Sequence, residues 1–192
     1  MAPIKSPEAA FAKAFGKGVS YRKYTSGDDD RLRERVPAVF RDIVKGDGWC
    51  SYREEVLWTC DPDDWAPVAR AWFKDTARAQ ILARTAFGDL LVWDEEWCWF
   101  VLVHHSRALQ WSDDPAWFFA RGITSSDFAT QTHLPARVRS AKAVAGPLAW
   151  DEMYTYVPAL GLGGDEATSE IERVKAREQL VFLSQVAPIL RS

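Results

Sequence analysis

The chain has 192 residues, of which 47% are hydrophobic and 27% are charged, and its formal net charge is -3. This composition excludes an intrinsically disordered chain, and no apolar run approaches the roughly 20 residues that a membrane-spanning helix needs. The mildly acidic balance argues against a general attraction to nucleic acid. We therefore expect a compact soluble protein.

The N-terminal fifty residues predict helices that glycine and proline separate. Residues 6–8 (Ser-Pro-Glu) have the signature of a helix start, and Gly16 lies where that helix stops. The aspartates at 28–30 suit the positive end of the dipole of a second helix. Pro37 breaks or restarts this helix, and the Gly-Asp-Gly stretch at 46–48 ends it.

The next segment predicts one strand and one helix. Residues 52–60 (YREEVLWTC) are rich in the residue types that favour a strand. Asp61 is a suitable N-cap and Pro62 suits the first position of the helix that follows. We expect the N-terminal part of the protein to end near Asp75.

From Gln80 onward the pattern changes to three strands, QILARTAF, DLLVWD and WCWFVLVHH. Apolar runs of this kind indicate central strands covered on both faces, and the short polar turn at 94–96 indicates antiparallel pairing. The segments 114–122 and 125–142 then predict helices.

The C-terminal part predicts a strand or hairpin over 148–160 and a last helix over 169–187. Ser169 and Glu172 have the spacing of a capping box at the start of that helix. The whole pattern indicates an α+β fold, in which an N-terminal helical or mixed region packs on a central antiparallel sheet closed by a C-terminal helix.

The stretch YTYVPALGLGG at 154–164 raises the question of a phosphate-binding loop. A Walker loop needs GxxxxGK(S/T), whereas Asp165 and Glu166 follow the glycines here. A Rossmann fingerprint also fails, because Glu166 stands at the third glycine position, and two carboxylates would repel a phosphate. We interpret the stretch as a tight turn into the last helix. A small-ligand or nucleotide-binding enzyme that uses Gly161–Gly164 stays an alternative.

No motif predicts catalysis or a metal site. His104 and His105 are neighbours on a predicted strand end, so their side chains point to opposite faces, and His133 lies in a separate predicted helix. No serine lies in GxSxG, and no cysteine has a local catalytic signature. Acidic pairs such as Asp63/Asp64 lie in predicted turns or helix starts, where acidic residues are common. We therefore predict a binding protein without catalytic residues, metal or cofactor.

The three cysteines are odd in number and lack Cys-x-x-Cys spacing, which is typical of reduced thiols in the cytoplasm. The first residues contain no apolar segment like that of a signal peptide. Basic residues at 137–142 and 173–177 could form one patch, but acidic or apolar residues separate them, as on an ordinary solvated helix face. A DNA-binding regulator is therefore a minor third alternative.

Several stretches resemble a known family. YTYVPALGLGG, followed by an amphipathic segment, and TAFGDLLVWD at 85–94 resemble the C-terminal domain of the immunity proteins that accompany type VI secretion DNase effectors. Three N-terminal stretches are similar to the GAD-like domain that precedes it in that family: GKGVSYRKYT at 16–25, VPAVFRDIVKGDGWCSY at 36–52 and LWTCDPDDW at 57–65. The resemblance implies a GAD-like domain over residues 1–76 and an immunity-family α+β domain over residues 77–192.

The resemblance also implies a function. A member of this family would bind a cognate nuclease toxin in the bacterial cytoplasm and neutralise it by protein-protein interaction, with no catalytic residue, no direct nucleic-acid contact and no membrane. We expect a monomer in the absence of the toxin. We hypothesise that an acidic, aromatic surface covers the basic DNA-binding surface of the toxin. The candidate contact residues are Asp94, Glu95, Glu96, Trp111, Asp113, Asp114, Asp165 and Glu166.

Overall fold

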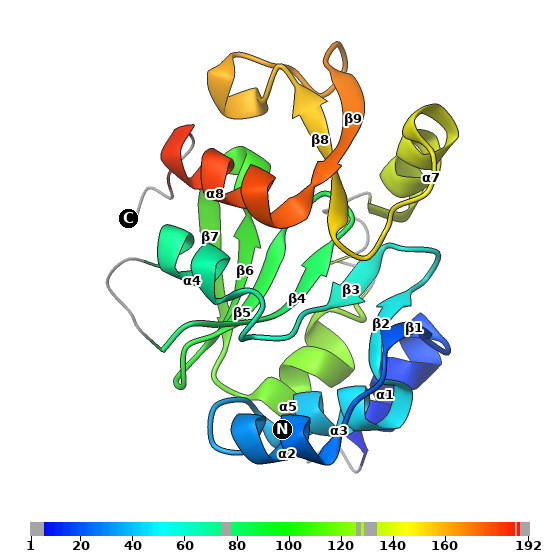
Figure 1. The fold of residues 1–192 in the computed structure, drawn as a ribbon, viewed down its shortest axis with the longest axis vertical. Coiled ribbons are helices and arrows are strands. Elements are labelled where there is room, and N and C mark those ends of the chain that lie inside the picture. Colours follow the sequence, from blue (N-terminus) through cyan, green and yellow to red (C-terminus); the bar gives the residue numbers. More distant parts are fainter. Residues whose placement is uncertain (1–5, 74–77, 126–127, 129–133, 187, 189–192) are drawn as a thin grey trace.

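The computed structural model describes residues 6–73, 78–125, 128, 134–186 and 188. Within these residues the chain has the α+β fold that the sequence predicts, with helices around an antiparallel sheet (Figure 1). The sheet there has seven strands in chain order, each antiparallel to the next: β1 (Val19–Arg22), β2 (Trp49–Tyr52), β3 (Leu57–Thr59), β4 (Gln80–Thr85), β5 (Leu90–Trp93), β6 (Cys98–Leu102) and β7 (Arg107–Ser112).

Both faces of the central strands are covered, because their side chains alternate between two buried clusters. On β5, Leu91 belongs to the first cluster, whereas Leu90 and Val92 belong to the second. The first cluster also contains residues of α1 (Pro7–Phe15), α2 (Ser26–Leu32), α3 (Ala38–Asp47) and a π-helical turn, η2 (Phe118–Gly122), that continues α5 (Pro115–Trp117). The second contains residues of α4 (Ala66–Trp72) and α8 (Ala176–Val186). The predicted central strands are thus confirmed.

The C-terminal part adds a hairpin and a helix over a third buried cluster: β8 (Glu152–Val157), β9 (Glu170–Lys175) and α7 (Leu134–Ala145). Tyr154 fastens the hairpin, because its backbone N–H donates to the Ala86 carbonyl at 2.9 Å and its hydroxyl donates to the Gly146 carbonyl at 2.7 Å. The indole N–H of Trp72 donates to the Leu180 carbonyl at 3.0 Å and joins α4 to α8. The C-terminal helix therefore closes the sheet as predicted.

The predicted helix over 169–187 is wrong in its first part. Residues 170–175 form β9, which pairs antiparallel with β8 from Glu152↔Lys175 to Val157↔Glu170, and α8 begins only at Ala176. The spacing of Ser169 and Glu172 fits a capping box, but pairing with β8 prevails over that local preference. The glycine stretch at 161–164 consequently lies in a loop between two strands and does not lead into a helix.

The single strand predicted over 52–60 is also wrong, because β2 ends at Tyr52 and β3 begins at Leu57. Three consecutive residues between them, Arg53, Glu54 and Glu55, have φ values of 49°, 56° and 78° and reverse the chain. Asp61 does not cap the next helix, because α4 begins at Ala66 and the Asp61 carboxylate binds arginines.

Two further differences concern the segment after β6. Residues 103–105 form a 3-10 turn, η1 (Val103–His105), and are not a strand end as predicted; residues 107–112 form β7, a strand that the sequence did not predict. The predicted helix over 125–142 is found in part as α7. The positions of Asp75, His133 and residues 126–127 lie outside the described residues.

Candidate protein-binding surface

One end of the sheet gathers most of the candidate acidic residues. β6 begins at Cys98, which pairs with Ser112 at the end of β7. The turn before β6 and the turn after β7 therefore lie side by side, and they hold five residues that we call the acidic end: Asp94, Glu95, Glu96, Asp113 and Asp114. Burial, together with the nearby charges of Asp94 and Asp114, raises the pKa of the Cys98 thiol to about 12.

The members of the acidic end differ in their local bonds. Asp94 holds the turn, because its carboxylate accepts hydrogen bonds from the Trp97 backbone N–H and the Trp99 indole N–H, both at 2.7 Å. Asp114 caps α5 by accepting the Trp117 N–H at 3.0 Å, and Glu95 lies 3.1 Å from Arg78.

The carboxylates of Glu96 and Asp113 are different. Both residues are exposed, and neither side chain makes a hydrogen bond or an ion pair with any residue that the structure describes. Within the acidic end, these are the two carboxylates that are free for a basic partner.

Trp111 lies beside the acidic end, in the wall of a surface pocket. Its ring contacts Phe100, Phe118 and Phe128 with centroid distances of 5.8–5.9 Å, so its inner side is part of the core. Trp111 also lines a pocket of about 430 Å³. The pocket is lined by Leu109, Gln110 and Trp111 from β7, and by Trp117, Arg121, Gly122 and Ser125 from the following helical segment.

The structure does not bring Asp165 and Glu166 to the same place. Glu166 lies 3.2 Å from His105 and 3.3 Å from Arg137, and His105 follows the far end of β6. These two residues are therefore at the opposite end of the sheet from the acidic end. The Asp165 carboxylate accepts the Ala167 N–H at 2.8 Å within its own loop.

The glycine loop uses its own N–H groups. Those of Leu162, Gly163 and Gly164 donate to carbonyls of Ala159 or Leu160 at 2.8–3.2 Å. A phosphate-binding loop needs such groups unpaired and directed at the ligand. Gly163 has a φ of +90°, which explains a glycine at that position by backbone geometry alone.

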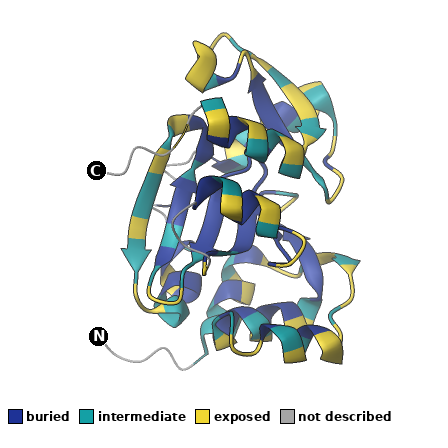
Figure 2. Cartoon of the chain, turned by 60° about the vertical axis from the view of Figure 1, so that its left-hand side comes forward, coloured by how far each residue is buried: buried dark blue, intermediate teal, exposed yellow. Residues whose placement is uncertain are grey.

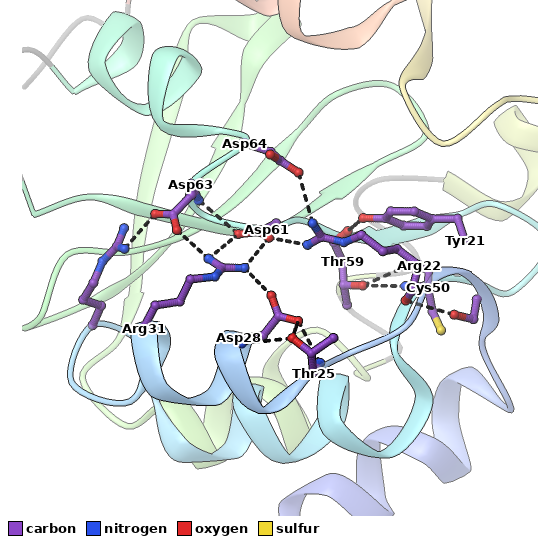
Figure 3. Close-up of polar contacts among 12 residues, drawn as sticks. Tyr21, Arg22, Thr25, Asp28, Arg31, Cys50, Thr59, Asp61, Asp63 and Asp64 are labelled. Atoms are coloured by element: carbon purple, nitrogen blue, oxygen red, sulfur yellow. Dashed lines mark hydrogen bonds and ion pairs between the residues drawn. The ribbon is translucent and has the colours of Figure 1, made fainter.

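A second set of carboxylates, near β1 and α4, is held by arginines (Figure 3). Asp61, which is only 3% exposed, accepts hydrogen bonds from Arg22 and Arg31. Arg31 also bonds Asp28 and Asp63, and Arg35 bonds Asp63 at 2.7 Å. The network ties β1 and α2 to the loop after β3, so we interpret it as structural.

The network lowers acidic pKa values in spite of burial. Burial raises the pKa of Asp28, but hydrogen bonds from Thr25 and Arg31 outweigh it and hold the pKa below its ordinary value. For Asp63, bonds and charges of Arg35 and Arg31 likewise prevail over burial and lower the pKa. Both groups therefore stay ionised at neutral pH.

Asp89 and His104 are buried ionisable residues under the C-terminal hairpin. Burial raises the pKa of Asp89 to about 7, although Thr85 donates a hydrogen bond to it at 3.1 Å and Val103 N–H donates one at 3.2 Å. Burial lowers the pKa of His104 to about 4, and its Nε2 lies 3.0 Å from the Phe87 carbonyl. Both residues are buried, at 7% and 5% exposed, so they do not form an open site.

In the described part of the chain, no three His, Cys, Asp or Glu side chains are grouped so that they could hold a metal ion. No helix there is long and apolar enough to span a bilayer. Cys50, Cys60 and Cys98 are buried free thiols.

Comparisons with known proteins identify two families along the chain. Residues 8–105 match the model of the GAD-like domain, and residues 116–187 match that of the C-terminal domain of the T6SS immunity protein Tdi1. No curated protein matches. The crystal structure of Atu4351 from Agrobacterium tumefaciens is similar, with a TM-score of 0.69 and 18% identity over 92% of this chain and 87% of that chain. At this identity the likeness shows the fold alone. The predicted division between residues 76 and 77 stays a prediction.

Proposed function

Because this chain belongs to the family that joins a GAD-like domain to the C-terminal domain of the T6SS immunity protein Tdi1, we propose that it neutralises a nuclease toxin by binding it. Membership of this family implies a cognate toxin as partner. The toxin in this proposal is a DNase, and the complex forms in the bacterial cytoplasm. The protein acts by binding and needs no catalytic residue.

The free carboxylates of Glu96 and Asp113 carry the proposal that the toxin is a nuclease. A nuclease holds the phosphates of DNA with basic side chains, so its active surface is complementary to exposed carboxylates. Charges of opposite sign speed the encounter and suppress wrong partners. The acidic end, together with the tryptophan pocket beside it, would occupy that basic surface and exclude DNA.

A sequestering complex must also be tight. Stable complexes of this kind bury about 1,600 Å² and depend on a few aromatic or arginine anchors. Trp111 and Trp117 provide aromatic surface at the margin of the acidic end. The alternative, a nucleotide-binding protein, gains no support from its loop, because the N–H groups of residues 162–164 are already bonded.

The experiment that tests the function is titration calorimetry of this protein against the inactivated nuclease domain encoded beside its gene, at physiological salt. We expect a one-to-one complex of nanomolar affinity. A parallel assay follows DNA cleavage by the active domain, which one equivalent of this protein should stop. Absence of binding would reject the proposal.

The nucleotide alternative has its own control. Thermal melting is measured with a panel of nucleotides, since a ligand at 100 times its Kd adds about 2.7 kcal/mol of stability. We expect no shift. A clear shift with one nucleotide, and no complex with the toxin domain, would favour the alternative.

A further inference from the structure

We propose that the outer edge of β7 receives an extended segment of the toxin as an added strand, with one side chain of that segment in the pocket between Trp111 and Trp117. This inference rests on the proposed function and specifies how the partner is held. In strand addition, main-chain hydrogen bonds supply affinity, and pockets for alternate side chains supply specificity.

The first observation is the position of β7 at the edge of the sheet. It pairs with β6 on one side, and no strand among the described residues pairs with its other side. Figure 2 shows it along the outer side of the sheet, with intermediate and exposed residues. An edge strand presents a row of unpaired N–H and C=O groups, which can pair with another chain.

The second observation distinguishes this edge from the other. β7 pairs with β6 in regular register over Arg107–Gln110, and its extra residue is Trp111, where the register shifts against Cys98 and Trp99. β1, at the opposite edge, is only four residues long, and its register is already interrupted between Ser20 and Arg22. Each edge strand thus contains one register shift, but β7 keeps four consecutive residues in regular register, whereas β1 keeps only Val19 and Ser20. The longer regular run is the better template for an added strand.

The third observation is the pocket that adjoins β7. Its volume of about 430 Å³ leaves room for one large side chain, and residues of β7 itself form one wall. Trp111 is fixed from behind by Phe100 and Phe118. Trp117, in the opposite wall, belongs to none of the buried clusters and is half-buried. A rigid wall and an accessible tryptophan are features of a side-chain anchor site.

The fourth observation is the charge along the edge. Asp113 follows the strand directly and, with Glu96, provides two exposed carboxylates without partners in the described residues. Arg107 at the start of β7 is exposed, and it also makes no ion pair with any described residue. A complementary segment is therefore basic where it meets Asp113 and acidic or neutral where it meets Arg107.

Hydrogen exchange tests the strand directly. The full-length protein is compared alone and with the inactivated nuclease domain, and peptides covering residues 107–112 and 19–22 are followed by mass spectrometry. We expect exchange to slow at least tenfold in the β7 peptide and to stay unchanged in the β1 peptide. Toxin binding without slower exchange in β7 would overturn the inference and leave the proposed function standing.

Affinity measurements test the pocket and the charges. Trp117→Ala should weaken toxin binding tenfold or more, as loss of an aromatic anchor does. The pair Glu96→Lys and Asp113→Lys should weaken it similarly. The matched control is Glu170→Lys with Glu172→Lys, which reverses two exposed charges on β9 that make no bond with described residues. Circular dichroism and melting confirm that each variant folds.

Further results would also contradict the inference. Equal loss in the control pair would mean that net charge alone governs binding. If Trp117→Ala binds the toxin domain with unchanged affinity, the pocket does not hold a side chain of the toxin. In the toxin-free protein, hydrogen exchange in β7 could slow as the protein concentration rises, while light scattering detects dimers. That result would assign the edge to a second copy of this chain. If the unchanged protein does not bind the toxin domain at all, the proposed function fails first and the inference fails with it.

Discussion

Two pairs of neighbouring aspartates have similar sequence contexts and opposite surroundings. Asp63 and Asp64 lie in CDPDDW, and Asp113 and Asp114 lie in SDDPAW. Asp63 bonds Arg31 and Arg35, and Asp64 lies 3.7 Å from Arg22, whereas Asp113 has no partner among the described residues. Arginines some 28–32 positions earlier in the chain decide whether the Asp63 carboxylate is free. Availability for a partner is therefore a property of the fold and not of the acidic motif.

The largest expected effect on stability comes from removing Asp61, the buried carboxylate at the centre of the network of aspartates and arginines near β1 and α4. Asp61→Ala removes the buried carboxylate that accepts hydrogen bonds from Arg22 and Arg31. Both arginines are partly exposed and keep other carboxylate partners, so we expect the free energy of unfolding to fall by about 2 kcal/mol. Urea denaturation at pH 7 measures it. Asp113→Ala is the matched control and should change stability by less than about 0.5 kcal/mol. Equal losses in the two variants would show that the two acidic sets do not differ.

Asp89 is a third kind of carboxylate, because it is buried and accepts hydrogen bonds from the Thr85 hydroxyl and the Val103 N–H. Its pKa is raised to about 7, so the folded state keeps a proton that the unfolded state has lost. The stability that this provides is complete below the ordinary aspartate pKa and is lost as pH rises through 7. His104 has its pKa lowered to about 4, and it destabilises the fold only as pH falls below 6.5.

Above pH 6.5, His104 therefore does not contribute to the pH dependence of stability, and the contribution of Asp89 can be measured alone. We expect the free energy of unfolding to fall by about 1 kcal/mol between pH 6.5 and 8, and Asp89→Asn to abolish that dependence. Urea unfolding at the two pH values measures it. The same slope in Asp89→Asn would assign the pH dependence to another group.

The smallest effect on stability is expected for the free carboxylates. Glu96→Gln with Asp113→Asn should leave the free energy of unfolding within about 0.5 kcal/mol of the unchanged protein. The association rate with the toxin domain should nevertheless fall severalfold and respond less to salt, because exposed charges at a rim act mainly on encounter. Stopped-flow mixing at two salt concentrations measures this, with Glu170→Gln and Glu172→Gln as the control. Identical association rates in all three proteins would show that the carboxylates of Glu96 and Asp113 do not steer the toxin electrostatically.

The sequence predicted the parts of the fold that local pattern decides. The apolar runs of β4, β5 and β6 and the proline and glycine boundaries of α3 are such signals, and they were interpreted correctly. Residues 170–175 were misassigned because their capping signal is local, whereas their strand conformation depends on pairing with β8. β7 was missed because an edge strand with exposed Arg107 and Gln110 has only weak apolar alternation.

The candidate surface shows the same limit. Acidic turns at 94–96 and 113–114 could be found in the sequence, but their proximity follows from the pairing of Cys98 with Ser112. Nothing in the sequence distinguished Glu96 and Asp113 from carboxylates that the fold uses itself, such as Asp61 and Asp94. Trp117 was also missed, because it becomes part of a pocket only where its helix meets β7.

The two walls of that pocket come from different parts of the gene. Leu109, Gln110 and Trp111 lie between the two segments that match known families, whereas Trp117, Arg121 and the residues after them lie within the second segment. Recombination between relatives near residue 115 would keep one wall and replace the other. The seven-stranded sheet would be inherited whole from one parent, whereas α8 and the hairpin that pack on it would come from the other. A crossover there therefore changes the pocket only where the buried clusters of the two parents are compatible.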